Sequence, residues 1–254
     1  MNNIPLSEYD DAIPAVIEPS QVVKPREDMP EHVVFCFFQE PIRKFCVDGG
    51  APQIGKTGSE IGINPIYKLE HGGQAVAVLH AGVGAPLSGS FLEEVIAMGG
   101  RKFIACGGAG VLDSEIPSGH VIVPISAIRD EGTSYHYLPP SREVAPHPDA
   151  VDAIVATLEA HDIPYDKGKT WTTDGVYRET PAKVAKRRAE GALSVEMEAA
   201  AFFAIAQFRG VTFGQMLYGG DDVSSSDWDS RDWDKQFGTR EKLFWLAVEA
   251  VTRL

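Results

Sequence analysis

Short apolar runs alternate with longer amphipathic segments along most of this chain. The short runs are rich in Val, Ile, Leu and Phe, and their length and composition are typical of buried strands. We expect strands at His32–Phe38, Gln74–His80, Lys102–Cys106, His120–Ile125, Lys169–Thr173 and Thr212–Tyr218. The longer segments have helical spacing, and we expect helices at Ala85–Met98, Pro148–His161, Pro181–Glu190, Val195–Phe208 and Arg231–Leu254.

This alternation predicts an α/β fold: a single domain with a central, mixed, mostly parallel sheet flanked by helices. Residues 1–31 differ from the rest, because they are rich in Pro, Asp and Glu and show little periodicity. We therefore expect an extended N-terminal arm at 1–31 and the folded domain at 32–254.

The composition argues against two classes of partner. A hydrophobic content of 44% and a charged content of 23% are typical of a soluble globular protein. The net charge of −13 argues against a nucleic-acid-binding surface, which needs clustered Lys and Arg. The sequence has neither an apolar run long enough to cross a bilayer nor a basic N-terminal region followed by an apolar core. We expect a cytoplasmic protein that binds neither nucleic acid nor membrane.

The cysteines and histidines show no metal-ligand spacing. Cys36, Cys46 and Cys106 are odd in number, and two of them lie within apolar runs, so we expect reduced core cysteines. The seven histidines are scattered along the chain. The sequence therefore predicts neither a metal site nor a cofactor.

Two carboxylates, Glu196 and Glu198, stand at the start of the apolar segment that runs to Phe208. A carboxylate buried there needs partners, and a helix N-terminus stabilises its charge. Its remaining lone pairs suit a pair of vicinal hydroxyls, such as those of a ribose. A capping acid in front of an ordinary core helix is the alternative interpretation.

Two glycine clusters follow predicted strands. They are Gly82-Val83-Gly84 and Gly107-Gly108-Ala109-Gly110. Glycines at the carboxyl ends of strands form tight turns or let a ligand approach the backbone. Leu87 and Asp113 occupy the third-glycine positions of a dinucleotide-binding motif, so a dinucleotide-dependent oxidoreductase is a poor match.

Taken in order, these motifs resemble the nucleoside phosphorylase family, which includes purine nucleoside phosphorylase, uridine phosphorylase and the methylthioadenosine nucleosidases. The matching elements are Glu40-Pro41-Ile42-Arg43, the two glycine clusters, Val195-Glu196-Met197-Glu198-Ala199, and an acid after the next strand. The resemblance runs from about residue 32 to the C-terminus. It implies a phosphorylase/hydrolase-like fold and a homo-oligomer, either a dimer or a hexamer.

The resemblance also implies roles for individual residues. Glu198 matches the glutamate that binds the ribose 2′ and 3′ hydroxyls, and Met197 and Val83 match positions that line the sugar pocket. Glu196 lies near the base or supports the sugar site. Val176 matches an aromatic position that stacks on the base, so the stacking surface is smaller here.

The acid that assists the departing base falls on Asp221 by position. A proton donated to N7 of a purine lowers the barrier, because glycosidic cleavage builds negative charge on the base. The adjacent Asp222 is a rival for this role. A turn after a strand is the structural alternative for both acids.

The phosphate site departs from the family pattern. Arg43 matches one phosphate-binding arginine, and Gly107, Gly108 and Glu40 are further candidates for the site of the attacking group. Ala105 stands where the family has a second arginine, Gly108 where it has a Ser or Thr, and Gln39 where it has a loop glycine.

Three functions therefore stay open. The first is phosphorolysis, in which a nucleoside, with a purine favoured, and phosphate as co-substrate give free base and ribose 1-phosphate. The second is hydrolysis of the same bond, with Glu40 activating water. The third is a catalytically inactive protein that binds or senses a nucleoside.

Overall fold

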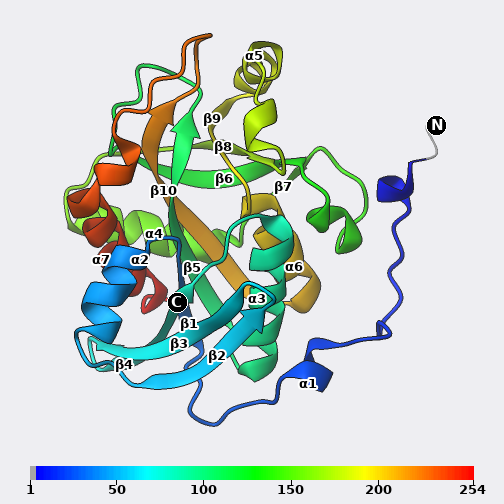
Figure 1. Ribbon diagram of the computed structural model, residues 1–254, viewed down its shortest axis with the longest axis vertical. Coiled ribbons are helices and arrows are strands. Elements are labelled where there is room, and N and C mark those ends of the chain that lie inside the picture. Colours follow the sequence, from blue (N-terminus) through cyan, green and yellow to red (C-terminus); the bar gives the residue numbers. More distant parts are fainter. Residues whose placement is uncertain (1–3) are drawn as a thin grey trace.

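The computed structural model describes residues 4–254 and shows a ten-stranded sheet with helices against its faces (Figure 1). The strands are β1 His32–Cys36, β2 Gln53–Ser59, β3 Gly62–His71, β4 Gln74–His80, β5 Lys102–Val111, β6 Val121–Asp130, β7 Glu143–Val144, β8 Tyr165–Thr173, β9 Ala192–Glu196 and β10 Thr212–Asp222. The α-helices are α1 Pro19–Val22, α2 Gln39–Ile42, α3 Ala85–Met98, α4 Pro148–Ala160, α5 Pro181–Ala189, α6 Ala199–Arg209 and α7 Phe237–Val251. A π-helical turn at Arg43–Val47 follows α2, and short 3₁₀ turns lie at Pro5–Ser7, Thr133–His136, Val176–Arg178 and Trp233–Lys235.

All six strands expected from the apolar runs are confirmed, and four of them extend further than the runs. The longest, β10, runs from Thr212 to Asp222, so Asp221 and Asp222 lie on the strand and not in a turn after it. The hairpin of β2 and β3 was not expected from the sequence, because its strands lack a continuous apolar run and bury only Ile54, Thr57 and Ile66.

The sheet closes on itself through strand β10. This strand pairs in parallel with β5 and antiparallel with β6, and the path from β6 through β8 and β9 returns to β5. Five of the ten pairings in the described chain are parallel and five are antiparallel. The mixed α/β architecture is therefore confirmed, but a parallel majority is not. The antiparallel pairs are β10–β6 and β5–β9 in the closed ring, the two pairs of the β2–β3–β4 hairpins, and the short β6–β7 pair.

Helices cover both faces of the strands at the centre of the sheet. Helices α3 and α6 lie on one side of β5 and β10, and α4 and α7 lie on the other (Figure 1). On the first side, Phe202 of α6 stacks on Phe213 of β10 with ring centroids 4.6 Å apart. Burial on both faces explains why these strands read as continuous apolar runs in the sequence.

The acidic segment before α6 is not helical as expected. Residues Ala192–Glu196 form β9, where Val195 pairs with Gly110, and α6 begins only after Glu198, its N-cap residue. The helix ends at Gly210, which has a left-handed backbone conformation with φ of 65°. The C-terminal helix is also shorter than expected, because residues 231–236 form a turn before α7.

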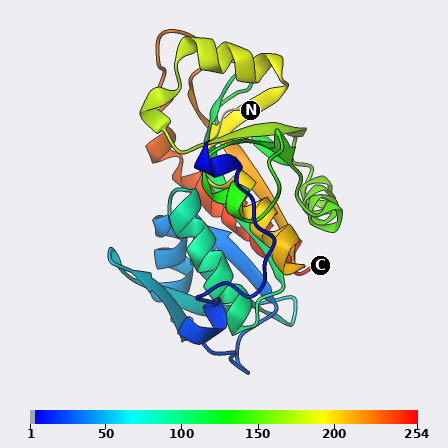
Figure 2. The same cartoon turned by 90° about the vertical axis from the view of Figure 1, so that its right-hand side faces the viewer.

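Residues 4–31 contain two short helical turns and no strand, and the first three residues of the predicted arm lie outside the described part. The arm runs down one side of the molecule to reach β1 (Figure 2). Near its end, the Arg26 N–H donates to the Met98 carbonyl at 2.9 Å, and the Met29 side chain is buried in the core.

Among the described helices, none has both the length and the apolar character required to cross a membrane. The three cysteines are buried and unpaired.

Candidate active site

A cavity of about 1200 Å³ opens where the loops that follow several strands meet. It brings together eight of the residues singled out from the sequence, namely Glu40, Val83, Gly108, Val176, Glu196, Met197, Glu198 and Asp221. They come from segments far apart along the chain. The cavity is therefore the candidate active site.

The Glu198 carboxylate lies at the centre of this arrangement. Its Oε1 accepts a hydrogen bond from the Gly84 N–H at 2.6 Å, and its Oε2 accepts one from the Met197 N–H at 3.2 Å. Only 5% of the residue is exposed. Burial, and then the charge of Glu196, raise the pKa of Glu198 above its ordinary value. Each oxygen keeps a lone pair that can accept a hydroxyl from the cavity.

Hydrogen bonds from the protein itself occupy both oxygens of the Glu196 carboxylate. Its Oε2 accepts hydrogen bonds from the backbone N–H groups of Glu198 and Ala199 at 2.7 and 2.6 Å. Its Oε1 accepts the hydroxyls of Thr172 and Thr170 at 2.6 and 3.3 Å. Glu196 thus satisfies the first N–H groups of α6 and fixes the backbone that presents Glu198.

The neighbouring acids Asp221 and Asp222 have different surroundings. The Trp228 indole N–H donates to Oδ2 of Asp221 at 2.7 Å, and Asp221 lines the cavity. Asp222 is not part of the lining; its carboxylate accepts from the Ser224 N–H at 2.8 Å and pairs with Arg231 at 2.6 Å. Burial alone would raise the pKa of Asp222, but these hydrogen bonds outweigh it and hold the pKa below its ordinary value.

A further carboxyl, Glu179, lines the cavity in the segment before α5. Burial, together with the negative charge of Asp221, raises the pKa of Glu179 to about 7. The sequence motifs gave no indication of this residue.

Arg240 of α7 is the one Lys or Arg side chain that lines the cavity within residues 4–254. Its Nη1 lies 3.0 Å from Oε1 of Glu40, its Nε donates to the Tyr218 hydroxyl at 3.2 Å, and its Nη2 donates to the Trp233 carbonyl at 3.1 Å. The guanidinium also lies 5.4 Å from the ring centre of Phe38. The sole cation of the described lining is thus already paired with a carboxylate.

A family model described as the phosphorylase superfamily matches residues 32–247, a span that contains every residue of the cavity lining. The chain belongs to the phosphorylase superfamily. Guanosine phosphorylase from Halorubrum lacusprofundi is 27% identical over 195 residues, which cover 74% of this chain and 80% of that protein. Uridine phosphorylase from Treponema pallidum is 29% identical over 153 residues, which cover 56% of this chain and 59% of that protein.

Solved structures share the fold of this superfamily member. Purine nucleoside phosphorylase from Toxoplasma gondii, in complex with immucillin-H, has a TM-score of 0.77 at 18% identity and covers 91% of this chain and 96% of its own. AMP nucleosidase from Bacteroides thetaiotaomicron has a TM-score of 0.72 at 22% identity, with coverages of 89% and 88%. At these identities, the likeness concerns the fold.

Two residues that match the phosphorylase phosphate site lie outside the cavity lining. The Arg43 side chain is 80% exposed in the π-helical turn and lies 3.9 Å from Asp48. Gly107 is buried under Phe37, whose ring atom lies 2.9 Å from the position of an added Cβ at Gly107. Of the predicted phosphate-site residues, only Gly108 and Glu40 face the cavity.

Two polar residues of the lining, His80 and Gln215, were not anticipated from the sequence. The Gly82 N–H donates to Nδ1 of His80 at 3.1 Å, which leaves the proton of the neutral ring on Nε2. Burial lowers the pKa of His80, so the ring is neutral near pH 7. Both residues lie inside apolar runs, where a single polar side chain is more often structural.

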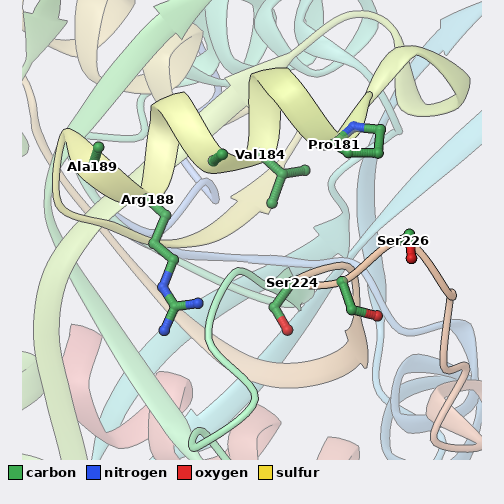
Figure 3. Close-up of a pocket in the computed structure, with 8 residues that line it drawn as sticks. Pro181, Val184, Arg188, Ala189, Ser224 and Ser226 are labelled. Atoms are coloured by element: carbon green, nitrogen blue, oxygen red, sulfur yellow. The ribbon is translucent and has the colours of Figure 1, made fainter.

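A smaller hollow of about 390 Å³ lies beside the cavity, between α5 and the residues Ser224–Ser226. The side chains of Val184 and Arg188 extend from α5 toward the segment that carries Ser224 (Figure 3). Arg188 pairs with Asp113 at 2.9 Å. The hollow shares Pro181, Ser225 and Ser226 with the main cavity, so it belongs to the wall of the same site.

The described residues contain no group of three or more His, Cys, Asp or Glu side chains arranged to hold a metal ion.

Proposed function

We propose that this member of the phosphorylase superfamily cleaves the N-glycosidic bond of a nucleoside, with a purine as the favoured base. Phosphate is the proposed nucleophile, so the products are the free base and ribose 1-phosphate. The observation that carries the proposal is the meeting of Glu198, Met197 and Asp221 in one cavity. The relatives named guanosine phosphorylase and uridine phosphorylase support it.

In this proposal, Glu198 binds the ribose. Each of its oxygens spends one acceptor position on a backbone N–H, so the remaining positions can accept the 2′ and 3′ hydroxyls. Two hydroxyl donors favour the ionised carboxylate and offset the effect of burial on its pKa. Met197 and Val83 give the sugar an apolar wall.

Asp221 assists the departing base. As the bond from C1′ to the base nitrogen breaks, its electron pair moves to the base, and a proton from Asp221 reaches N7 of the purine. Asp221 regains that proton from the O–H of the nucleophile through solvent, so the overall reaction consumes and releases no proton. The Trp228 N–H orients the Asp221 carboxyl, and Val176, which lines the same cavity, is the proposed neighbour of the base.

The phosphate site is the least complete part of the cavity. Gly108 and the guanidinium of Arg240 are the groups of the described lining that suit an anion. Arg43 and Gly107 lie outside the lining. Phosphate therefore has to share Arg240 with Glu40.

Hydrolysis is the second candidate, and the pairing of Arg240 with Glu40 favours it. With its cation already neutralised, the described lining offers a phosphate dianion no unpaired positive charge. Glu40 is half-exposed toward the cavity and has a second oxygen that can accept a proton from water.

Incubation with a panel of purine and pyrimidine nucleosides, with and without phosphate, tests both candidates. Free base and ribose 1-phosphate that form only with phosphate support phosphorolysis. Release of free base and ribose at the same rate with and without phosphate supports hydrolysis. Nucleoside binding by calorimetry without any turnover contradicts both and indicates a binding or sensing protein.

We also propose that the chain works as a homo-oligomer, a dimer or a hexamer as in its family. Five large hydrophobic side chains of the cavity lining are exposed, namely Val83, Val176, Tyr177, Trp228 and Trp233, and Tyr177 is 94% exposed. A second copy that packs against these side chains would bury them. Light scattering after size-exclusion chromatography measures the copy number.

The unpaired cysteines support a reducing, cytoplasmic setting.

A further inference from the structure

Gln215 carries a buried amide with no protein partner. The residue lies on β10, is 1% exposed, and lines the cavity. Neither its Nε2 nor its Oε1 has a hydrogen-bond partner among the residues that the structure describes. A buried amide destabilises a fold unless something satisfies it, so an amide retained at a cavity wall points to a ligand.

The sheet register separates Gln215 from Asp221 along β10. Gln215 pairs with Ala105 of β5, one residue before the level at which β1 and β4 end. Asp221 lies six residues further along the same strand, roughly 20 Å away at about 3.3 Å per residue.

Glu198 lies between these two levels. Val195 pairs with Gly110, close to the level of Asp221, and β9 runs antiparallel to β5. The residues from Val195 to Glu198 therefore run back toward the level of Gln215. A nucleoside with its sugar at Glu198 and its base at Asp221 therefore turns the other face of the sugar toward Gln215.

Displacement at C1′ requires the nucleophile on the face opposite the departing base. We infer that Gln215 binds the attacking oxygen: its NH₂ donates to that oxygen, and its carbonyl accepts the O–H of the same group. Water and hydrogen phosphate both carry such an O–H, so the amide suits either source. This inference rests on the proposed function and adds the residue that holds the nucleophile.

The displacement reaction balances in the same way whether water or hydrogen phosphate supplies the attacking oxygen. The bond from the attacking oxygen to C1′ forms as the bond from C1′ to the base breaks, and the electron pair leaves with the base. The hydrogen of the attacking O–H replaces the proton that Asp221 gives to the base.

The variant Gln215→Met tests the inference, since it keeps the length of the side chain and removes its donors and its acceptor. With guanosine as substrate, we expect the turnover number to fall at least 10-fold if the wild-type reaction needs no phosphate. If it needs phosphate, we expect kcat/KM for phosphate to fall at least 10-fold. In both arms the dissociation constant of guanosine stays within 3-fold of the wild type, as it does for the control Gln53→Met at an exposed position.

A thermal-unfolding measurement shows that the variant is folded, and its Tm without ligand should equal or exceed that of the wild type, because an unpartnered amide is gone. The variant Gln215→Glu is a second test. If the reaction needs phosphate, the negative charge of the new side chain repels it, so kcat/KM for phosphate should fall further than in Gln215→Met.

Several results overturn the inference. Unchanged rates in Gln215→Met do so, as does a loss of guanosine affinity that accounts for the whole loss of rate. A loss of rate that vanishes with a 5′-deoxynucleoside assigns the amide to the 5′ hydroxyl instead. Wild-type protein that cleaves no nucleoside overturns the proposed function together with the inference, whereas active wild type with an equally active Gln215→Met overturns the inference alone.

Discussion

The Glu196 carboxylate accepts the backbone N–H of Glu198 at 2.7 Å, so one acid of the pair holds the other in place. Glu196 is saturated by two N–H groups and two hydroxyls, whereas Glu198 keeps acceptor positions toward the cavity. Two acids that are nearly identical in sequence context therefore have different tasks. Glu198 faces the cavity, and Glu196 fixes the backbone that carries Glu198.

Replacement of Glu198 by Gln should reduce kcat/KM for a ribonucleoside by about 100-fold or more, since hydrogen bonds to a charged acceptor are each worth about 1.5–3 kcal/mol. Steady-state kinetics measures the loss. The control Glu60→Gln, at an exposed turn, should leave kcat/KM unchanged. A Glu198→Gln variant with wild-type kcat/KM would contradict the ribose-binding role.

Replacement of Asp221 by Asn should reduce turnover of purine nucleosides by about 10²–10⁴-fold, the usual range for a lost general acid. A nitrophenyl riboside, whose leaving group needs no proton, should lose much less. The adjacent Asp222→Asn is the matched control. It removes the charge that pairs with Arg231, so it should lower Tm and leave the rate of the folded enzyme within about 3-fold. The reverse pattern would assign the acid role to Asp222.

Glu179 should give the stability of the protein a specific pH dependence. Its pKa rises from 4.5 in the unfolded chain to about 7 in the folded one, so the folded state holds a proton that the unfolded state has released. Its contribution to the free energy of unfolding is therefore constant below pH 4.5 and falls as the pH rises toward about 7. The variant Glu179→Gln has no proton to release, so it does not lose this free energy of unfolding as the pH rises. Urea unfolding should find both proteins similar near pH 4 and the variant more stable at pH 8; a difference that does not depend on pH would contradict the raised pKa.

Replacement of Arg240 by Met should lower the free energy of unfolding by about 2–4 kcal/mol, because it removes the hydrogen bonds of a buried guanidinium to the Tyr218 hydroxyl and the Trp233 carbonyl, each worth about 1.5–3 kcal/mol. Denaturant titration measures the change. The control Arg43→Met removes an exposed guanidinium and should stay within about 0.5 kcal/mol. Equal effects at the two positions would show that the burial of Arg240 contributes nothing to stability.

The apolar runs predicted the six main strands, because strands buried on both faces carry a signal that needs no knowledge of their neighbours. They did not predict the β2–β3 hairpin, because its strands bury few residues and carry no continuous apolar run. The helix was expected to begin at Val195 because the residues directly after Glu198 are alanines, which favour a helix. Pairing of Val195 with Gly110, a contact between residues 85 positions apart, makes the segment around Val195 a strand instead.

The motifs, through the family that they resemble, placed Glu198, Met197 and Asp221 among the candidates, because a family match follows the order of residues along the chain. The tertiary structure decided what local order cannot: that Asp222 is bound to Arg231, and that Arg240, Glu179 and Gln215 join the cavity from distant segments. Arg43 lies outside the cavity lining because the turn that carries it faces solvent. A motif fixes which chemical groups are present, but burial and the closure of β10 on β5 determine which of them meet and which charges are neutralised.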